Sequence, residues 1–264
     1  MSNLQKVIKC GAVAFGLFLA FSIIFGITTF VLSLTGVLNN DKDSDNLNEI
    51  KVSDVMSLDI DVKSASIVIK EGKKFKVETD NDNIKVIEKN NELRIIEKKL
   101  KLFKNDNKVV ITLPSSLVFE EVKIDAGSGT IDFYQLQTKK LDIDLGAGSA
   151  YIENLIVYES ASIDGGAGKI VIYDGKINDL ELDMGVGELD LTSKITGSSE
   201  IDAGVGSIKL NLLGVKDDYK IKASKGLGSF KIQDESIANG SIYGSGNNFI
   251  DISGGIGNIN INFK

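Results

Sequence analysis

Ile201-Asp-Ala-Gly-Val-Gly-Ser-Ile208 is one of seven copies of a short phrase that recurs between Ile124 and Ile261. The second glycines of successive copies lie 19, 20, 19, 19, 22 and 29 residues apart. The seven glycine pairs are Gly127 and Gly129, Gly146 and Gly148, Gly166 and Gly168, Gly185 and Gly187, Gly204 and Gly206, Gly226 and Gly228, and Gly255 and Gly257. A period near twenty that holds for four successive steps is typical of a solenoid, in which each repeat forms one coil.

The apolar residues inside each copy keep a period of two and then slip. Ile201, Ala203 and Val205 occupy every second position, but the next apolar residue, Ile208, comes three positions after Val205. The alternation predicts short strands with one buried face. The slip predicts a corner at the glycines, which can adopt positive φ. Strand-type residues follow the glycines, whereas a dinucleotide fingerprint would need a helix there. We therefore interpret all seven glycine pairs as structural corners.

Stacking is what allows such coils to bury their apolar rows. Coils about 4.8 Å apart would share backbone hydrogen bonds along the stack and form ladders of like side chains inside it. The repeats therefore predict an all-β fold, a parallel β-helix whose coils are 19–20 residues long.

The N-terminal region carries the sequence of a membrane anchor. No charged residue occurs between Cys10 and Asn40, and this apolar run exceeds the roughly 20 residues that a spanning helix needs. Lys6 and Lys9 precede the run and acidic residues follow it, so the positive-inside rule places the N-terminus in the cytoplasm and the remainder outside. We expect a single-pass protein of the cell membrane with an uncleaved signal anchor. The expected divisions are a cytoplasmic stub at 1–10, a transmembrane helix at 11–38, a polar linker at 39–55, irregular opening coils and a cap at 56–115, and regular repeats at 116–264.

Composition excludes several classes of chemistry. The chain has no His, and its only Cys, Cys10, precedes the apolar run, so the expected outer domain lacks the commonest general base, a thiol and any disulfide. No nucleophile motif is recognisable. The net charge of −7 disfavours nucleic acid as a partner. We expect no enzyme activity and no cofactor.

One repeated acid has possible chemistry. The residues are Asp125, Asp144, Asp164, Asp183 and Asp202, which hold the same place in successive copies and are expected to point outward. Carboxylates about 5 Å apart in water repel by roughly 0.8 kcal/mol before salt screening, so a solvated acidic face is tolerable without an ion. Calcium bound between coils is the alternative, although Ca²⁺ takes six to eight oxygens and no carbonyl-rich loop accompanies these carboxylates. We favour the solvated face and expect no metal.

The anchor, the Val110-Ile-Thr-Leu-Pro114 strand and the repeated Ile-Asp-x-Gly-x-Gly-x-Ile units together resemble the bacterial "putative adhesin" family of β-helical envelope proteins. The likeness extends from about Met56 to Lys264. It implies a right-handed β-helix outside the cytoplasm that is associated with the cell envelope or its stress response, and it carries over no site residue.

Two functions remain open from the sequence. The first is a non-enzymatic, membrane-anchored surface module that binds an envelope protein or a glycan, or stiffens an envelope assembly. The second is a sensory or regulatory protein for envelope stress. A cytoplasmic stub of ten residues is too short to signal alone, so this second function would require a membrane partner. The sequence identifies neither the ligand nor the oligomeric state.

Overall fold

The computed structural model describes residues 48–51, 55–98 and 107–264. All of them belong to the second of two compact units, Asn46–Lys264. The expected transmembrane helix at 11–38 lies outside the described residues. Within the described part, no helix is long and apolar enough to cross a membrane.

The described residues are almost entirely strand. The strands are β1 (Asn48–Lys51), β2 (Ser57–Val62), β3 (Ser66–Glu71), β4 (Lys76–Thr79), β5 (Ile84–Lys89), β6 (Glu92–Glu97), β7 (Lys108–Leu113), β8 (Phe119–Ile172), β9 (Gly175–Asn178), β10 (Leu180–Thr196), β11 (Ser198–Leu212), β12 (Tyr219–Ile232), β13 (Glu235–Ser236), β14 (Ile242–Tyr243) and β15 (Asn248–Phe263). One 3₁₀ turn, η1 (Lys216–Asp218), precedes β12. Strands such as β8, with 54 residues, continue around several corners because the backbone ladder is not interrupted there.

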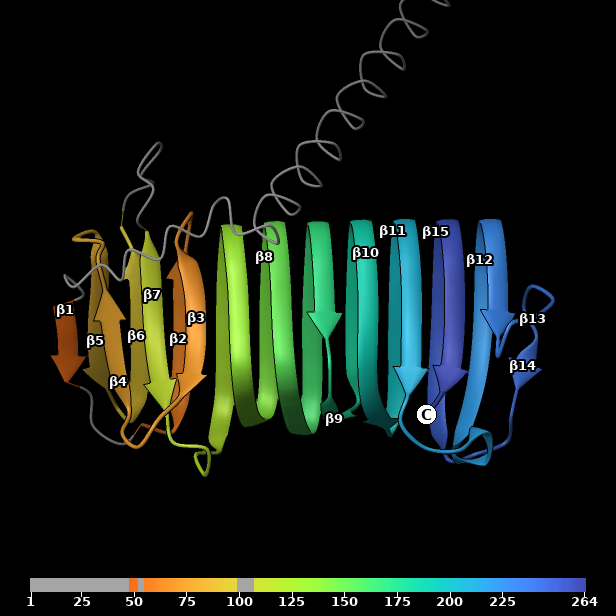
Figure 1. The fold of residues 1–264 in the computed structure, drawn as a ribbon, viewed down its shortest axis with the longest axis horizontal. Coiled ribbons are helices and arrows are strands. Elements are labelled where there is room, and N and C mark those ends of the chain that lie inside the picture. The colour runs from red at the N-terminus through yellow and green to blue at the C-terminus, as the bar shows by residue number, and fades with distance from the viewer. Residues whose placement is uncertain (1–47, 52–54, 99–106) are drawn as a thin grey trace, which may run out of the picture. The chain divides into compact units, whose positions relative to one another are not determined.

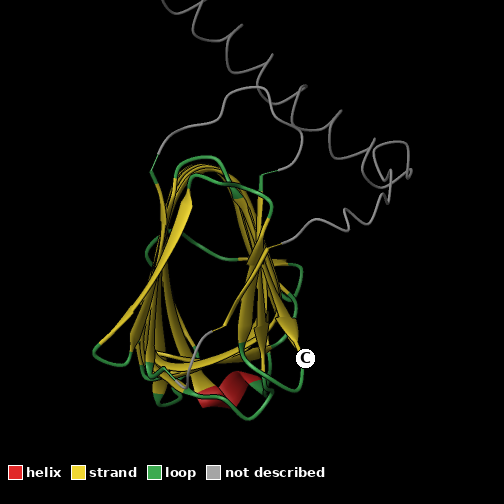
Figure 2. Ribbon diagram, turned by 90° about the vertical axis from the view of Figure 1, so that its left-hand side faces the viewer, coloured by secondary structure: helices red, strands yellow, loops and turns green. Residues whose placement is uncertain are grey.

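Parallel pairing stacks the repeats in register. β10 pairs with β8 on one side and with β11 on the other, so Leu182 lies between Ile163 and Ile201. All three side chains are buried. Figure 1 shows these coils side by side, and Figure 2, turned by 90°, shows their ribbons superposed. The buried apolar side chains form one core cluster inside the coils. The expected all-β solenoid with parallel coils is confirmed.

The coils do not stack in chain order at the C-terminal end. β15 pairs in parallel with both β11 and β12, so Ile256 lies between Val205 and Leu227. Chain order alone would place β12 against β11. The copies are interchangeable because each presents the same backbone edge and the same glycines to its neighbour. The outer edge of β12 is then covered by the short antiparallel strands β13 and β14.

The N-terminal end is closed by hairpins. β2 and β3 form the first coil and pair in parallel with β8. β6 and β7 stack outside them, again in parallel, whereas β5, β4 and β1 complete the edge in antiparallel orientation. A turn at Asn90-Asn91 joins β5 to β6, and both residues have positive φ, at 54° and 62°. β1 (Asn48–Lys51) lies within the range 39–55 that the sequence predicted as a polar linker.

Candidate functional site

The glycine pairs form two columns along the stack, one of first glycines and one of second glycines. The two columns require glycine for different reasons. The second glycine of a pair, such as Gly187, has φ of 153°, and a Cβ there would overlap the carbonyl oxygen of Gly168 in the neighbouring coil. The first glycine, such as Gly185, has no positive φ, but a Cβ would lie 2.5 Å from the carbonyl oxygen of Gly166. Close approach of successive backbones therefore favours glycine in both columns, whereas the positive φ expected at corners occurs within the pairs only at second glycines, at all of them except Gly148.

The five repeated aspartates occupy matching positions of neighbouring coils. We call this row the acidic column; it consists of Asp125, Asp144, Asp164, Asp183 and Asp202. Asp183 pairs in register with Asp164 and with Asp202, and Asp125 pairs with Asp61 of β2. Asp125, Asp144, Asp164 and Asp183 are exposed, and Asp202 is half-buried. The column ends where β15 and β12 begin, because the matching positions there are Ser253 and Ser224.

The negative charges of the acidic column repel one another. Partial burial, followed by the charges of Asp144, Asp61 and Asp59, raises the pKa of Asp125 above its usual value. Partial burial and then the charges of Asp183 and Asp144 raise the pKa of Asp164 in the same way. Like charges disfavour ionisation, so the neighbouring carboxylates of the column add to the effect of burial at Asp125 and Asp164.

Nothing in the described residues gathers the carboxylates around an ion. No group of three or more His, Cys, Asp or Glu side chains there has the arrangement of a metal site. One oxygen of Asp202, Oδ1, is buried without a hydrogen-bond partner. The column itself contributes one carboxylate from each coil, which makes a line, whereas a Ca²⁺ coordination shell needs six to eight oxygens around one point.

A buried carboxylate that the sequence analysis missed closes the N-terminal coil. Glu97, at the end of β6, is 1% exposed. Its oxygens accept hydrogen bonds at 2.8–3.3 Å from the backbone N–H groups of Lys63, Ser64 and Ala65, the hydroxyl of Ser64, and the side-chain amides of Asn81 and Asn107. Burial alone would raise the pKa of Glu97, but these hydrogen bonds outweigh it and lower the pKa below the usual value. A single glutamate among many gives no sequence signal for this role.

An apolar ridge runs along the glycine corners toward the C-terminal end of the stack. We define it by the middle residues of four G-x-G copies, in spatial order Val186, Val205, Ile256 and Leu227. Val186 is half-buried, and the exposed fraction then rises from 44% at Val205 to 54% at Ile256 and 71% at Leu227. The alternation predicted Val205 on the buried face, and this was wrong because the inward parity already ends at the first glycine of the pair. The signal in the sequence is the variable residue of the repeat, which is serine or alanine in the first three copies and a larger apolar residue in the last four.

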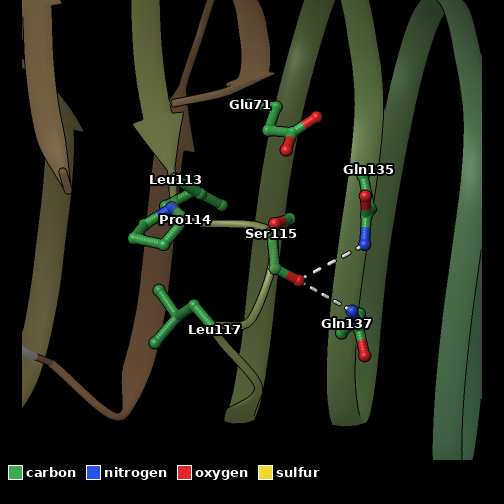
Figure 3. A pocket seen from close by; sticks show the side chains of 7 residues that line it. All are labelled: Glu71, Leu113, Pro114, Ser115, Leu117, Gln135 and Gln137. Atoms are coloured by element: carbon green, nitrogen blue, oxygen red, sulfur yellow. Dashed lines mark hydrogen bonds between the residues drawn. The ribbon is translucent and has the colours of Figure 1, made fainter. Parts of the chain in front are cut away.

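The two best-formed pockets among the described residues are too small for a ligand. The better-formed one lies where the chain leaves β7, and Figure 3 shows the amides of Gln135 and Gln137 pointing at the carbonyl oxygen of Ser115. These amides donate hydrogen bonds of 3.4 and 2.9 Å to that oxygen. The volume of this pocket is about 10 Å³, enough for about one water molecule. A second pocket of the same size lies under the corner at Gly166.

The repeated architecture identifies the class of protein. A model of the Toastrack DUF4097 family matches residues 55–252, which are 198 of the 264 residues. The chain therefore belongs to the Toastrack DUF4097 family, a domain family of unknown function. The family resemblance that the sequence analysis drew from the repeats is confirmed by this match.

Comparison with curated proteins finds no match. Among solved structures, the chain is similar to a "putative cell adhesion protein" of Clostridium sporogenes, with 19% identity, coverage of 83% of this chain and 100% of the other, and a TM-score of 0.36. It is similar to a "putative adhesin" of Bacteroides fragilis, with 20% identity, 83% and 98% coverage, and a TM-score of 0.38. It is also similar to a "putative lipid binding protein" of Parabacteroides distasonis, with 17% identity, 82% and 96% coverage, and a TM-score of 0.39. At these TM-scores no property of this chain is inferred from the three structures.

Proposed function

We propose that the chain is a non-enzymatic, membrane-anchored cell-surface module, whose solenoid, right-handed by resemblance, presents its outer faces to an envelope protein or a glycan. The observation that carries the proposal is the contrast between interior and surface. Ligand pockets usually enclose about 300–1,000 Å³, whereas the two best-formed pockets in the described residues hold about 10 Å³ each. Recognition by this domain therefore takes place on its outer surface.

The structure of the described part suits a rigid spacer or platform. Inward side chains such as Ile60, Ile95 and Leu210 are fully buried, and both ends of the stack are closed by antiparallel strands. Closed ends prevent further strands from adding to the stack. A domain of this kind stays a discrete unit and holds its faces at fixed spacing.

The location is proposed from the sequence. The uncharged apolar segment at 11–38 anchors the chain, and the lysines before it keep the N-terminus in the cytoplasm. The solenoid then lies outside the cell membrane. Lys42 stands in the sequence between the apolar segment and β1 and offers a site for trypsin in an external digestion.

The location is tested by adding trypsin to wall-stripped protoplasts that carry the full chain. We expect trypsin to release the solenoid without lysis. Complete protection of the solenoid in intact protoplasts, with cleavage only after lysis, would reverse the orientation.

Partner binding is tested by photo-crosslinking in intact cells. A photo-crosslinking residue is placed at Tyr173, which is 57% exposed, and in parallel at buried Leu182 as the matched control. We expect a discrete adduct with an envelope protein or glycan from position 173 alone. Capture of a membrane kinase or transporter would favour the regulatory function instead, and equal adducts from both positions would contradict a surface-specific contact.

A further inference from the structure

The apolar ridge is unusual in its electrostatic surroundings as well as in its exposure. Along β8, β10 and β11 the corners are flanked by the acidic column, but beside Ile256 and Leu227 the flanking positions are Ser253 and Ser224. The side chains of the ridge are therefore largest and most exposed at the place where the row of carboxylates stops.

The terminal coil adds positive charge at the same place. β12 contains four lysines and no acidic residue; the lysines are Lys220, Lys222, Lys225 and Lys231. The ammonium group of Lys225 donates a 2.7 Å hydrogen bond to the carbonyl oxygen of Gly228, which holds it beside Leu227. Lys222 pairs with Asp251, the only acid of β15. The acids that flank β12 along the chain lie beyond its two ends, at Asp217 and Asp218 before Tyr219 and at Asp234 and Glu235 after Ile232.

The size of the ridge decides what kind of partner fits it. A stable protein interface uses about 20–30 residues from each partner, whereas the ridge offers four side chains. A few exposed apolar side chains beside lysines are instead what a peripheral membrane contact requires, because the apolar groups enter the boundary between headgroups and acyl chains and the lysines meet anionic lipids.

We propose that the apolar ridge and the lysines of β12 dock on an anionic phospholipid surface. The contact rests on the proposed membrane-anchored function, because a tether keeps the ridge at a high effective concentration near the bilayer and a weak contact is then sufficient. Since the ridge follows the stacking direction, docking through it lays the solenoid along the membrane and fixes which faces remain open to a partner.

The test uses the full chain in vesicles. Cys10→Ser removes the only native cysteine, and single cysteines are introduced by Leu227→Cys or, as the matched control, Tyr173→Cys, which replaces another exposed large side chain. Each cysteine carries an environment-sensitive fluorophore, and the vesicles contain a nitroxide lipid as quencher. With phosphatidylglycerol present, we expect severalfold stronger quenching at position 227 than at position 173. The difference should shrink in pure phosphatidylcholine and at high salt.

A second variant protects the test against a labelling artefact. Adding Val205→Ser and Ile256→Ser to the Leu227→Cys chain removes neighbouring parts of the ridge. Both side chains are exposed, so we expect little change in melting temperature but a loss of the extra quenching. Equal quenching at 227 and 173 in anionic vesicles would overturn the proposal. Equal effects in neutral and anionic vesicles would overturn the choice of an anionic surface. A concentration-dependent blue shift in detergent without a bilayer would assign the ridge to a second copy of the chain instead.

Flotation of the same vesicles separates this proposal from the proposed anchor. A chain that floats with neutral and anionic vesicles alike, but shows no difference in quenching, retains the anchor and overturns the docking. A chain that floats only with anionic vesicles, and only while the ridge is intact, supports the docking and contradicts the anchor. A chain that never floats contradicts both.

Discussion

The carboxylate of Glu97 accepts a 2.8 Å hydrogen bond from the backbone N–H of Ser64, which lies at the corner of the first coil. At the next corner the N–H of Ser128 donates at 3.0 Å to the backbone carbonyl of Lys63 in the preceding coil. The side chain of Glu97, at the end of β6, thus supplies to the corner of the first coil the acceptors that the backbone of a regular outer coil would supply. This is how the N-terminal corner avoids unpaired buried donors.

Replacing this carboxylate should destabilise the solenoid. We expect Glu97→Gln to cost about 1–3 kcal/mol, because the amide presents one acceptor oxygen where two were used and leaves buried N–H groups unsatisfied. Chemical denaturation of the variant and the wild type measures the difference. Glu153→Gln is the control, since Glu153 is exposed. Equal stability of all three proteins would show that Glu97 has no capping role.

The same residue predicts a pH dependence. Its pKa is lowered in the folded chain from the ordinary 4.5, so the folded state holds its proton less tightly than the unfolded state does. The stabilisation is therefore fully present above pH 4.5 and is lost as the pH falls through the lower folded value. The difference in free energy of unfolding between the wild type and Glu97→Gln should shrink on acidification. A difference that stays constant from pH 7 to pH 3 would contradict the ionised network.

The second glycines should tolerate substitution least. Gly187→Ala combines a disfavoured φ of 153° with overlap of the neighbouring backbone, and we expect a loss well above 1 kcal/mol. Gly240→Ala is the matched control, because Gly240 also has positive φ, at 75°, but nothing lies within 4 Å of its Cβ position. Gly185→Val tests close approach without positive φ and should also lower the melting temperature. If Gly187→Ala and Gly185→Val cost no more than Gly240→Ala, coil contact is not what requires glycine.

The acidic column should slightly destabilise the folded state. Replacing Asp144, Asp164 and Asp183 with Asn removes repulsions of roughly 0.8 kcal/mol per neighbouring pair in water before screening. We therefore expect equal or slightly higher stability, most visible at low salt. Asp190→Asn is the contrast, because it breaks the 2.9 Å ion pair with Lys209 and should not stabilise. A melting temperature of the wild type that rises with millimolar Ca²⁺, and does so neither in the Asn variant nor with matched ionic strength, would show a metal site.

The raised pKa of Asp164 gives the opposite pH trend to Glu97. A carboxyl whose folded pKa lies above its unfolded value penalises the folded state when ionised, and the penalty is relieved as the pH falls through the folded pKa. Acidification from neutral pH should thus favour the wild type over the triple Asn variant. No change in their stability difference would contradict the repulsion.

The sequence predicts most of what repeats and little of what does not. The repeat period and the two-residue alternation of apolar residues predicted the corner at Gly185 and Gly187. They also predicted that Asp164 and Asp183 lie in one line, because each coil meets its neighbour in the same register. The same regularity hides the stacking order. The edge of β11 fits the copy around Ile256 as well as the copy around Leu227, so position along the chain does not decide which one follows. The role of Glu97 could not be predicted from the sequence, because the corner that it contacts lies 32–34 residues away along the chain.

The stacking order at the C-terminal end is the central claim, since it both closes the solenoid and builds the apolar ridge. It is tested most directly by disulfide formation in the Cys10→Ser chain. In-register coils lie about 4.8 Å apart and coils two layers apart about 9.6 Å, whereas a disulfide requires Cα atoms within about 7 Å. Val205→Cys with Ile256→Cys should therefore form a disulfide readily under mild oxidation, and Val205→Cys with Leu227→Cys should not. A disulfide in the second pair and none in the first would place β12 directly on β11 and contradict the order described.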